Sequence, residues 1–101
     1  MKTVIAWWDL DSGTIDVASL RDCLRREGVQ AWAEMPGLVA KFWISNGSRW
    51  GAVMVFESED AARQALPPNR AAELIGGPAS TRLTFDVEAF VSGPGGAAPW
   101  Q

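Results

Sequence analysis

The pair Asn46-Gly47 in the middle of the chain is the feature that most constrains its fold. It lies between two runs of β-branched, aromatic and other apolar residues, 38–45 and 51–57. Asn-Gly favours a type I′ turn, because both central residues of this turn need positive φ, and such turns join antiparallel strands. We therefore expect a central β-hairpin, whose two-residue turn would place Trp43 directly opposite Trp50.

A strand and at least one helix are expected on each side of this hairpin. Asp16 is the predicted N-cap of a first helix, in which apolar residues recur at helical spacing and Gly28 marks a point of interruption. Ser58 is the predicted N-cap of a second helix, which Pro67-Pro68 ends. In chain order, the expected elements are a strand over 2–9, a helix over 17–35, strands over 38–45 and 51–57, a helix over 59–66, a further helical turn or two over 69–75 and a strand over 82–91.

This order of elements is the split βαβ arrangement, which predicts an α+β, ferredoxin-like fold. Right-handed crossovers place both helices on one face of a four-stranded antiparallel sheet. At 101 residues the chain fits a single domain, which we place at 1–91. The remaining residues, 92–101, are rich in Gly, Pro and Ala and are predicted to form a flexible tail that carries Trp100.

The alternation of residues along the strands predicts which face of the sheet the helices cover. The last strand alternates between apolar and polar residues, and we expect its apolar residues to face the helices. The helix-covered face would then carry Phe42, Ile44, Val53, Val55, Leu83, Phe85, Val87 and Ala89. The uncovered face would carry Trp43, Trp50, Met54, Phe56 and Phe90, beside Lys41, Asp86 and Glu88.

An uncovered face with these large apolar side chains predicts a homodimer. Monomers rarely expose contiguous apolar patches larger than a few hundred Å². A second copy that packs sheet against sheet is the simplest cover, and Lys41 would form a charge pair with Asp86 or Glu88 across the interface.

The composition excludes several classes of activity. A net charge of −3 provides no basic face for phosphates, so we expect no nucleic-acid partner. The chain contains neither histidine nor tyrosine, which excludes Ser-His-Asp and Cys-His catalysis and removes the commonest metal and haem ligand. No glycine loop between a strand and a helix could hold a cofactor phosphate. We therefore expect no metal and no cofactor.

The cysteine content and the N-terminus bear on the compartment. The single Cys23 cannot form an internal disulfide, and it lies in the apolar stripe of the first helix, where a buried structural thiol is expected. The apolar run after Lys2 is too short to span a membrane and lacks a signal-peptide cleavage pattern. These features predict a cytoplasmic protein with no membrane partner.

Tryptophan is the residue type that points to a ligand. The chain contains six tryptophans, and such large rings line cores, interfaces and pockets for aromatic ligands. We expect a hydrophobic aromatic small molecule to bind in a cavity lined by Trp7, Trp8, Trp32, Trp43, Met54 and Phe56.

The stretch from Met35 to Ser58 resembles the YdhR-like monooxygenases, which belong to the dimeric α/β barrel superfamily together with the antibiotic-biosynthesis monooxygenases. The matching features are Pro36-Gly37, Lys41-Phe42-Trp43, Asn46, Gly51 and Phe56-Glu57-Ser58. The order of elements also matches over about residues 2–91. The resemblance implies a dimeric barrel and an oxygenase.

In the cofactor-independent oxygenases of this superfamily, an asparagine and a tryptophan beside the pocket help an electron-rich polycyclic phenol to react with O₂. The resemblance makes Asn46 and Trp50 the catalytic candidates and Trp43 a pocket wall. The expected function is thus a cofactor-independent monooxygenase for an aromatic or polyketide-like compound. The turn also explains Asn46, and packing also explains Trp50.

Two further interpretations stay open. The same cavity would serve a non-catalytic, dimeric small-molecule-binding module. A polyketide cyclase or lactone isomerase would instead need a carboxylate base, for which Asp9, Asp86 and Glu88 are candidates if burial raises the pKa of the carboxyl group.

Overall fold

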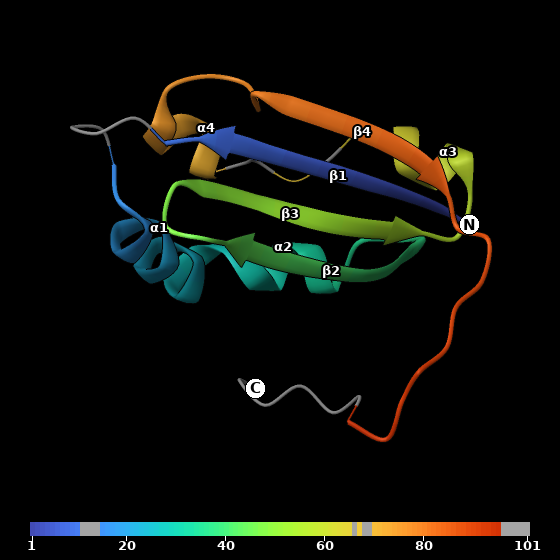
Figure 1. Cartoon of the computed structure of the whole chain (residues 1–101). Helices are drawn as coiled ribbons and strands as arrows, with labels where there is room; N and C mark the ends of the chain where they lie inside the picture. The colour runs from blue at the N-terminus through green and yellow to red at the C-terminus, as the bar shows by residue number, and fades with distance from the viewer. Residues whose placement is uncertain (11–14, 66, 68–69, 96–101) are drawn as a thin grey trace.

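The computed structural model describes residues 1–10, 15–65, 67 and 70–95. In chain order its elements are β1 (Lys2–Asp9), α1 (Val17–Cys23), a π-helical segment η1 (Leu24–Gly28), α2 (Val29–Ala33), β2 (Leu38–Ser45), β3 (Arg49–Phe56), α3 (Glu59–Arg63), α4 (Arg70–Ile75) and β4 (Thr81–Asp86). The strands form one antiparallel sheet in the order β2-β3-β1-β4, and Figure 1 shows the helices behind it. The predicted α+β, ferredoxin-like fold with helices on one face is confirmed.

Both predicted helix N-caps are present. The backbone N–H of Ser19 donates to Asp16 Oδ1 at 2.8 Å, and that of Ala61 donates to Ser58 Oγ at 3.1 Å. Each cap satisfies a backbone donor that has no partner inside the helix. Leu66, Pro68 and Asn69, at the expected junction of the two later helices, lie outside the described residues, as do Asp11-Ser12-Gly13 and residues 96–101 of the tail.

The expected single helix over 17–35 is interrupted by the π-helical segment, which ends at Gly28. Cys23 and Trp32 are both buried, although they lie about two and a half ideal α-helical turns apart. That spacing would place them on opposite sides of a straight α-helix. A wider π turn changes the helical phase between them, so both can face the sheet.

The central hairpin is present, but its expected two-residue turn is wrong. Ser45 pairs with Trp50, and Trp43 pairs with Ala52 rather than Trp50; residues 46–48 lie between the two strands. The side chain of Asn46 accepts hydrogen bonds within this connection, which stabilises a longer turn than type I′. Trp43 and Trp50 still share one face of the sheet.

The last strand is shorter than expected. β4 ends at Asp86, which pairs with Lys2, the first residue of β1. One further backbone bond follows, from the Val87 N–H to the Met1 carbonyl at 3.0 Å. Because β4 is an edge strand that pairs only with β1, it ends where its partner begins.

The predicted assignment of the two faces is inverted. The helices cover the face that carries most of the buried side chains of β1 and β3, namely Val4, Ala6, Trp8, Trp50, Ala52, Met54 and Phe56. The other face, here called the open face, carries Phe42, Ile44, Leu83 and Phe85, each between 42% and 50% exposed. The alternation of β4 misled the assignment, because polar side chains of an edge strand can reach solvent from the helix side.

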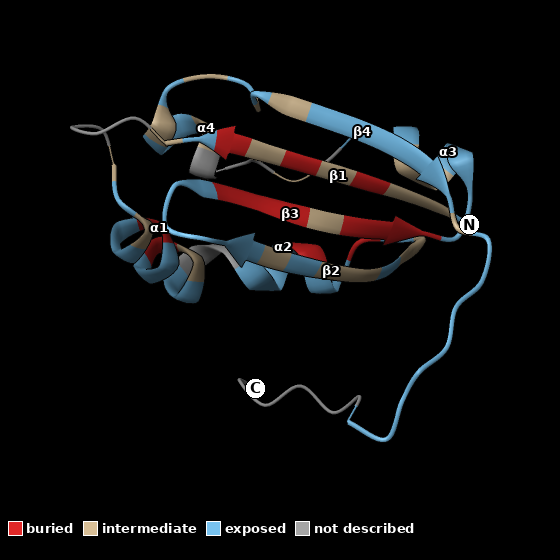
Figure 2. Ribbon diagram, viewed as in Figure 1, coloured by how far each residue is buried: buried red, intermediate tan, exposed pale blue. Residues whose placement is uncertain are grey.

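The core lies between the two central strands and the helices, as the red bands of β1 and β3 in Figure 2 show. One cluster contains Val4, Trp32, Met35, Met54 and Phe56, and a second contains Trp8, Leu20 and Trp50. Trp43 packs against both clusters. The space between these clusters is where the cavity described below opens.

Gly51 is required by close packing on the open face. It pairs with Trp7 across β1 and β3, and a Cβ at Gly51 would lie 2.7 Å from Trp7 Cβ. Only glycine leaves room for Trp7 to lie across the neighbouring strand.

Candidate functional site

A cavity of about 310 Å³ opens between the sheet and the helices. This volume lies near the lower end of the range for small-molecule sites, which is about 300–1,000 Å³. Trp8, Trp32, Trp43 and Trp50 contribute rings to its walls, and Lys41 and Arg82 contribute the two charged groups. The remaining lining residues are Ala6, Gly51, Ala52, Met54, Pro67, Ala72, Pro78 and Ala79.

The sheet positions most of the aromatic wall. Trp8 and Trp50 pair across β1 and β3, and their side chains point from the sheet toward the helices. The indole Nε1 of Trp8 donates to the Gly77 carbonyl at 2.9 Å. This bond fixes one ring while leaving its apolar surface to the cavity.

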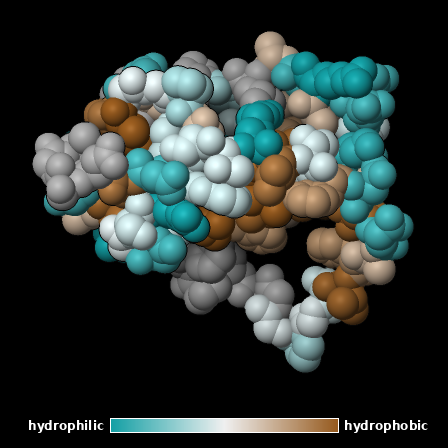
Figure 3. All heavy atoms as spheres, turned by 45° about the horizontal axis from the view of Figure 1, so that its top comes forward, coloured by the Kyte–Doolittle hydropathy of each residue, from teal (hydrophilic) through white to brown (hydrophobic). Residues whose placement is uncertain are grey.

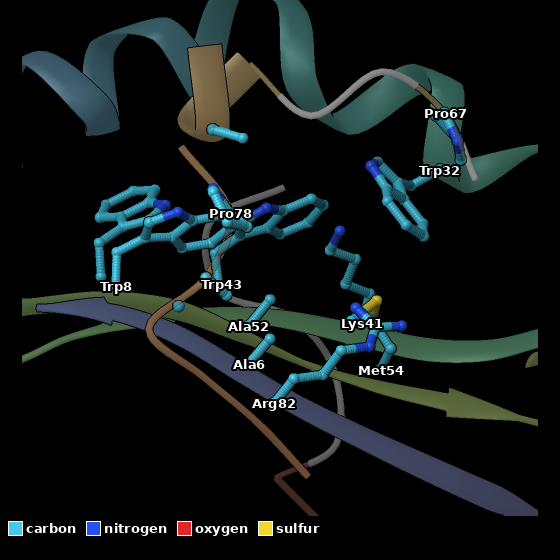
Figure 4. A pocket seen from close by; sticks show the side chains of 14 residues that line it. Ala6, Trp8, Trp32, Lys41, Trp43, Ala52, Met54, Pro67, Pro78 and Arg82 are labelled. Atoms are coloured by element: carbon cyan, nitrogen blue, oxygen red, sulfur yellow. The ribbon is translucent and has the colours of Figure 1, made fainter. Parts of the chain in front are cut away.

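Trp32 enters from the helical layer and closes the opposite side. Figure 4 shows its ring across the cavity from Trp8, with Lys41 reaching from β2 toward it. Lys41 Nζ lies 3.1 Å from the centroid of the Trp32 ring and 4.7 Å from that of the Trp43 ring. The lysine thus contacts two ring faces, an arrangement that favours its charged form.

Burial acts on Lys41 in the opposite direction. Loss of water is the main cause that lowers the pKa of Lys41 to about 7, and the positive charge of Arg82 is the second. At neutral pH the amine is therefore present in both its neutral and its charged form. The ring faces favour the charged amine, whereas the loss of water favours the neutral amine.

Arg82 is the second cation of the cavity. It lies on β4, opposite Ala6 of β1, and Figure 4 shows its side chain near Met54 and Lys41. Within the described part of the chain, neither Lys41 nor Arg82 forms an ion pair. Two cations without a carboxylate create a positive potential beside aromatic walls.

The structure brings together five of the residues that the sequence assigned to the pocket or to catalysis: Trp8, Trp32, Trp43, Trp50 and Met54. Trp7 lies instead on the open face, where the guanidinium carbon of Arg49 is 5.7 Å from its ring centroid. Phe56 is 1% exposed and belongs to the core rather than to the cavity lining. Successive side chains of a strand point to opposite faces of the sheet, so Trp7 and Trp8 lie on different faces.

Asn46 does not line the cavity. It is exposed in the hairpin connection, where its Oδ1 accepts from the backbone N–H of Ser48 at 3.1 Å and of Arg49 at 2.9 Å. The structure therefore places Asn46 and Trp50 in different environments, the turn and the cavity wall.

The candidate carboxylate bases also lie away from the cavity lining. Asp86 is exposed and hydrogen-bonded to Lys2, which lowers the pKa of the Asp86 carboxyl group. The condition for a base, a pKa raised by burial, is therefore not met at Asp86, because Lys2 lies beside its carboxyl group. Glu88 is exposed beyond β4, and Asp9 forms an exposed ion pair with Arg49 at 2.8 Å.

No group of three or more His, Cys, Asp or Glu in the described ranges is placed to hold a metal ion. The helices found in those ranges are too short or too polar to cross a membrane. Cys23 is buried, as expected.

Sequence reasoning missed the two cavity cations. Lys41 was assigned to a charge pair across an interface, and Arg82 received no role. The available signal was that Lys41 lies two residues before Trp43 in the same strand, which places both side chains on the same face. With the faces assigned correctly, this pattern would have predicted a lysine among tryptophans.

Comparison with known proteins supports the fold. No family model and no curated protein matches the chain. Among solved structures, it is similar to the crystal structure of NE2512, a protein of unknown function from Nitrosomonas europaea, with a TM-score of 0.70. The two share 19% sequence identity over 89% of this chain and 91% of the other. This similarity shows a common fold, and the YdhR-like resemblance stays a prediction.

Proposed function

We propose that this protein binds a compact aromatic or polyketide-like anion, with the rings among the tryptophans and the anionic oxygen at Lys41 and Arg82. The observation that supports the proposal is that two cations, the partly buried Lys41 and the exposed Arg82, line the tryptophan cavity and form no ion pair with a carboxylate of the described residues. A neutral apolar ligand would leave both charges without a partner. An anion compensates them and also fills the aromatic space.

Oxygenation without a cofactor is the reaction that we propose for this site. The bound enolate or phenolate transfers one electron to O₂, and the substrate radical and superoxide combine to a peroxide anion. This anion takes a proton from water to give a hydroperoxide, which loses water to leave a carbonyl group. Lys41 and Arg82 stabilise the anion before this transfer, a role that the sequence had assigned to Asn46. The substrate supplies the electrons, so no metal or flavin is needed.

The open face supports the proposed homodimer, with a different set of residues from those expected. Figure 3 shows brown, apolar residues interspersed with white and teal ones on the side of the molecule that is turned toward the viewer. The strand residues that share this face between the ends of the sheet are uncharged, whereas Asp9 and Arg49 lie at one end. A face without charge at its central positions can pack on its own copy without like-charge repulsion, so we propose a second copy as its partner.

Ligand binding is tested by quenching of tryptophan fluorescence. We expect 2-naphthoate to bind more tightly than its neutral methyl ester, and Arg82→Met to remove this preference. Arg21→Met, which changes an exposed arginine of α1, is the control and should leave the preference intact. Equal affinities of the acid and the ester for the unmodified protein would contradict an anion site.

Oxygenation is tested by O₂ consumption with 1,8-dihydroxyanthrone. We expect catalysed consumption that Arg82→Met reduces and that Asn46→Ala leaves unchanged. Binding of the anthrone without O₂ consumption would retain the binding site and reject the oxygenase.

A further inference from the structure

We infer that Lys41 is a nucleophile that forms an imine with an aromatic carbonyl compound carrying a carboxylate group, which Arg82 attracts into the cavity. This inference rests on the proposed anion-binding site and adds a covalent step to it. The ligand class is an aromatic aldehyde or ketone with an acidic substituent.

The position of Lys41 differs from that of an ordinary surface lysine. Its amine lines the cavity and contacts the rings of Trp32 and Trp43, and within the described residues no carboxylate forms an ion pair with it. The chain contains one other lysine, Lys2, whose amine is bonded to Asp86. Lys2 is thus an internal control for any chemistry of lysine.

The electrostatics favour a reactive amine at Lys41. Only a neutral amine attacks a carbonyl carbon, and burial in an apolar site beside another cation is the usual way to obtain one at neutral pH. Burial and Arg82 lower the pKa of Lys41 to about 7, whereas the bond to Asp86 raises the pKa of Lys2. The apolar surroundings and Arg82, which lower the pKa of Lys41, also suit the site to an aromatic anion.

The covalent step needs no oxidant or cofactor. The Nζ lone pair attacks the carbonyl carbon and forms a C–N bond, while the carbonyl π electrons move to oxygen. A proton passes from nitrogen to that oxygen, and a further proton allows it to leave as water. The product is an iminium ion, whose positive charge lies beside the rings of Trp32 and Trp43 that already accommodate the ammonium group.

The experiment is reductive trapping of the full-length protein with 4-formylbenzoate and cyanoborohydride, followed by peptide mapping. At pH 7.5 we expect an adduct at Lys41 that forms about a hundredfold faster than the adduct at Lys2, because the fractions of neutral amine differ at least that much. The methyl ester should label Lys41 more slowly while labelling the exposed N-terminal amine at an unchanged rate.

Variants test the role of the neighbouring cation. Lys41→Arg should remove the cavity adduct, and Arg82→Met should slow its formation and move the pH midpoint of labelling upward, since a positive neighbour is lost. The pH midpoint of the unmodified protein, expected near 7 at Lys41, needs no variant and holds even if a substitution unfolds the chain.

The outcomes separate this inference from the proposed function. If 4-formylbenzoate quenches tryptophan fluorescence but labels Lys41 no faster than Lys2, the covalent inference is wrong and the binding site stands. If it neither quenches nor labels, both proposals are wrong. Equal rates of labelling at Lys41 by 4-formylbenzoate and by its methyl ester would contradict the proposed role of Arg82.

Discussion

The two faces of the sheet are both apolar, yet they differ in what accompanies the apolar side chains. The helix-covered face combines wide rings with the cations Lys41 and Arg82. The open face presents Phe42 and Phe85 at about half exposure, with no charge among its central positions. Charge, rather than hydrophobicity, therefore distinguishes a face suited to a ligand from a face suited to a second copy of the chain.

The difference also shows why a sheet with two apolar faces is informative. A monomeric ferredoxin-like domain needs only one apolar face, the one under its helices. Here the second face has no cover within the described residues, and the first has a cavity beside its core. Each departure from a simple domain corresponds to one of the proposed partners.

Truncation of Trp50 should lower the free energy of unfolding more than any other change considered. Compared with truncation of an open-face residue, it shows how burial differs between the two faces. Trp50 is 5% exposed, so Trp50→Ala is expected to lower the free energy of unfolding by about 3–5 kcal/mol at any protein concentration. Phe42→Ala, at 46% exposure, should cost about 1–2 kcal/mol in dilute protein and more at high concentration, where the dimer covers it. Urea titrations at several protein concentrations measure the stability loss of each variant. Equal losses that do not depend on protein concentration would contradict the difference between the two faces.

A charge placed on the open face should break the dimer. Phe85→Glu puts two like charges into a face that pairs with itself, and we expect association to weaken about a hundredfold, or about 2.7 kcal/mol. Leu74→Glu is the matched control, because Leu74 is also an exposed apolar residue but lies on α4. Light scattering over a dilution series reports the change; a monomer before any substitution, or equal effects of both variants, would contradict the proposed interface.

The pH dependence of stability should distinguish the partly buried Lys41 from the exposed cations. The folded-state pKa of Lys41, about 7, lies below its unfolded value, so the unfolded chain holds an extra proton between these values and stability rises with pH. The contribution is at most about 1.4 kcal/mol per pH unit from pH 7 upward. Lys41→Met should remove this rise.

Urea titrations between pH 6.5 and 9.5 compare Lys41→Met with Lys2→Met as the control. The exposed Lys2 has a raised pKa, so its loss should leave the slope in this range intact. Parallel curves for the unmodified protein and Lys41→Met would show that Lys41 remains fully charged against the rings of Trp32 and Trp43.

Much of the fold could be predicted because its signals are local. The bounds of β1 and β2 agree with the sequence prediction, since alternation and β-branched residues act over a few residues, and Asp16 and Ser58 cap as expected. The end of β4 was not predictable from its own residues, because it depends on where β1 begins. Gly28 marked the place where the first helix is interrupted, whereas the π-helical form of the interruption depends on tertiary packing.

The site was only partly predictable, for a different reason. Five of the assigned aromatic and apolar residues line the cavity, because large rings are rarely left in water. Asn46 was assigned by resemblance, and Arg82 was invisible because an arginine on an edge strand has the same sequence pattern whether it faces solvent or a cavity. The inverted faces were the source of both the missed cations and the wrong interface.

Asn46→Ala is expected to have the smallest effect, and it tests whether the hairpin connection belongs to the site. Its Oδ1 accepts two backbone N–H groups in an exposed turn, so water can replace it and the loss should be about 1 kcal/mol. Asn46→Asp keeps an acceptor oxygen and should recover most of that loss. Affinity for 2-naphthoate should be unchanged in both variants, since the residue does not line the cavity. A loss of affinity in Asn46→Ala without a loss of stability would instead return the turn to the binding site and require that it move toward Trp50 when ligand binds.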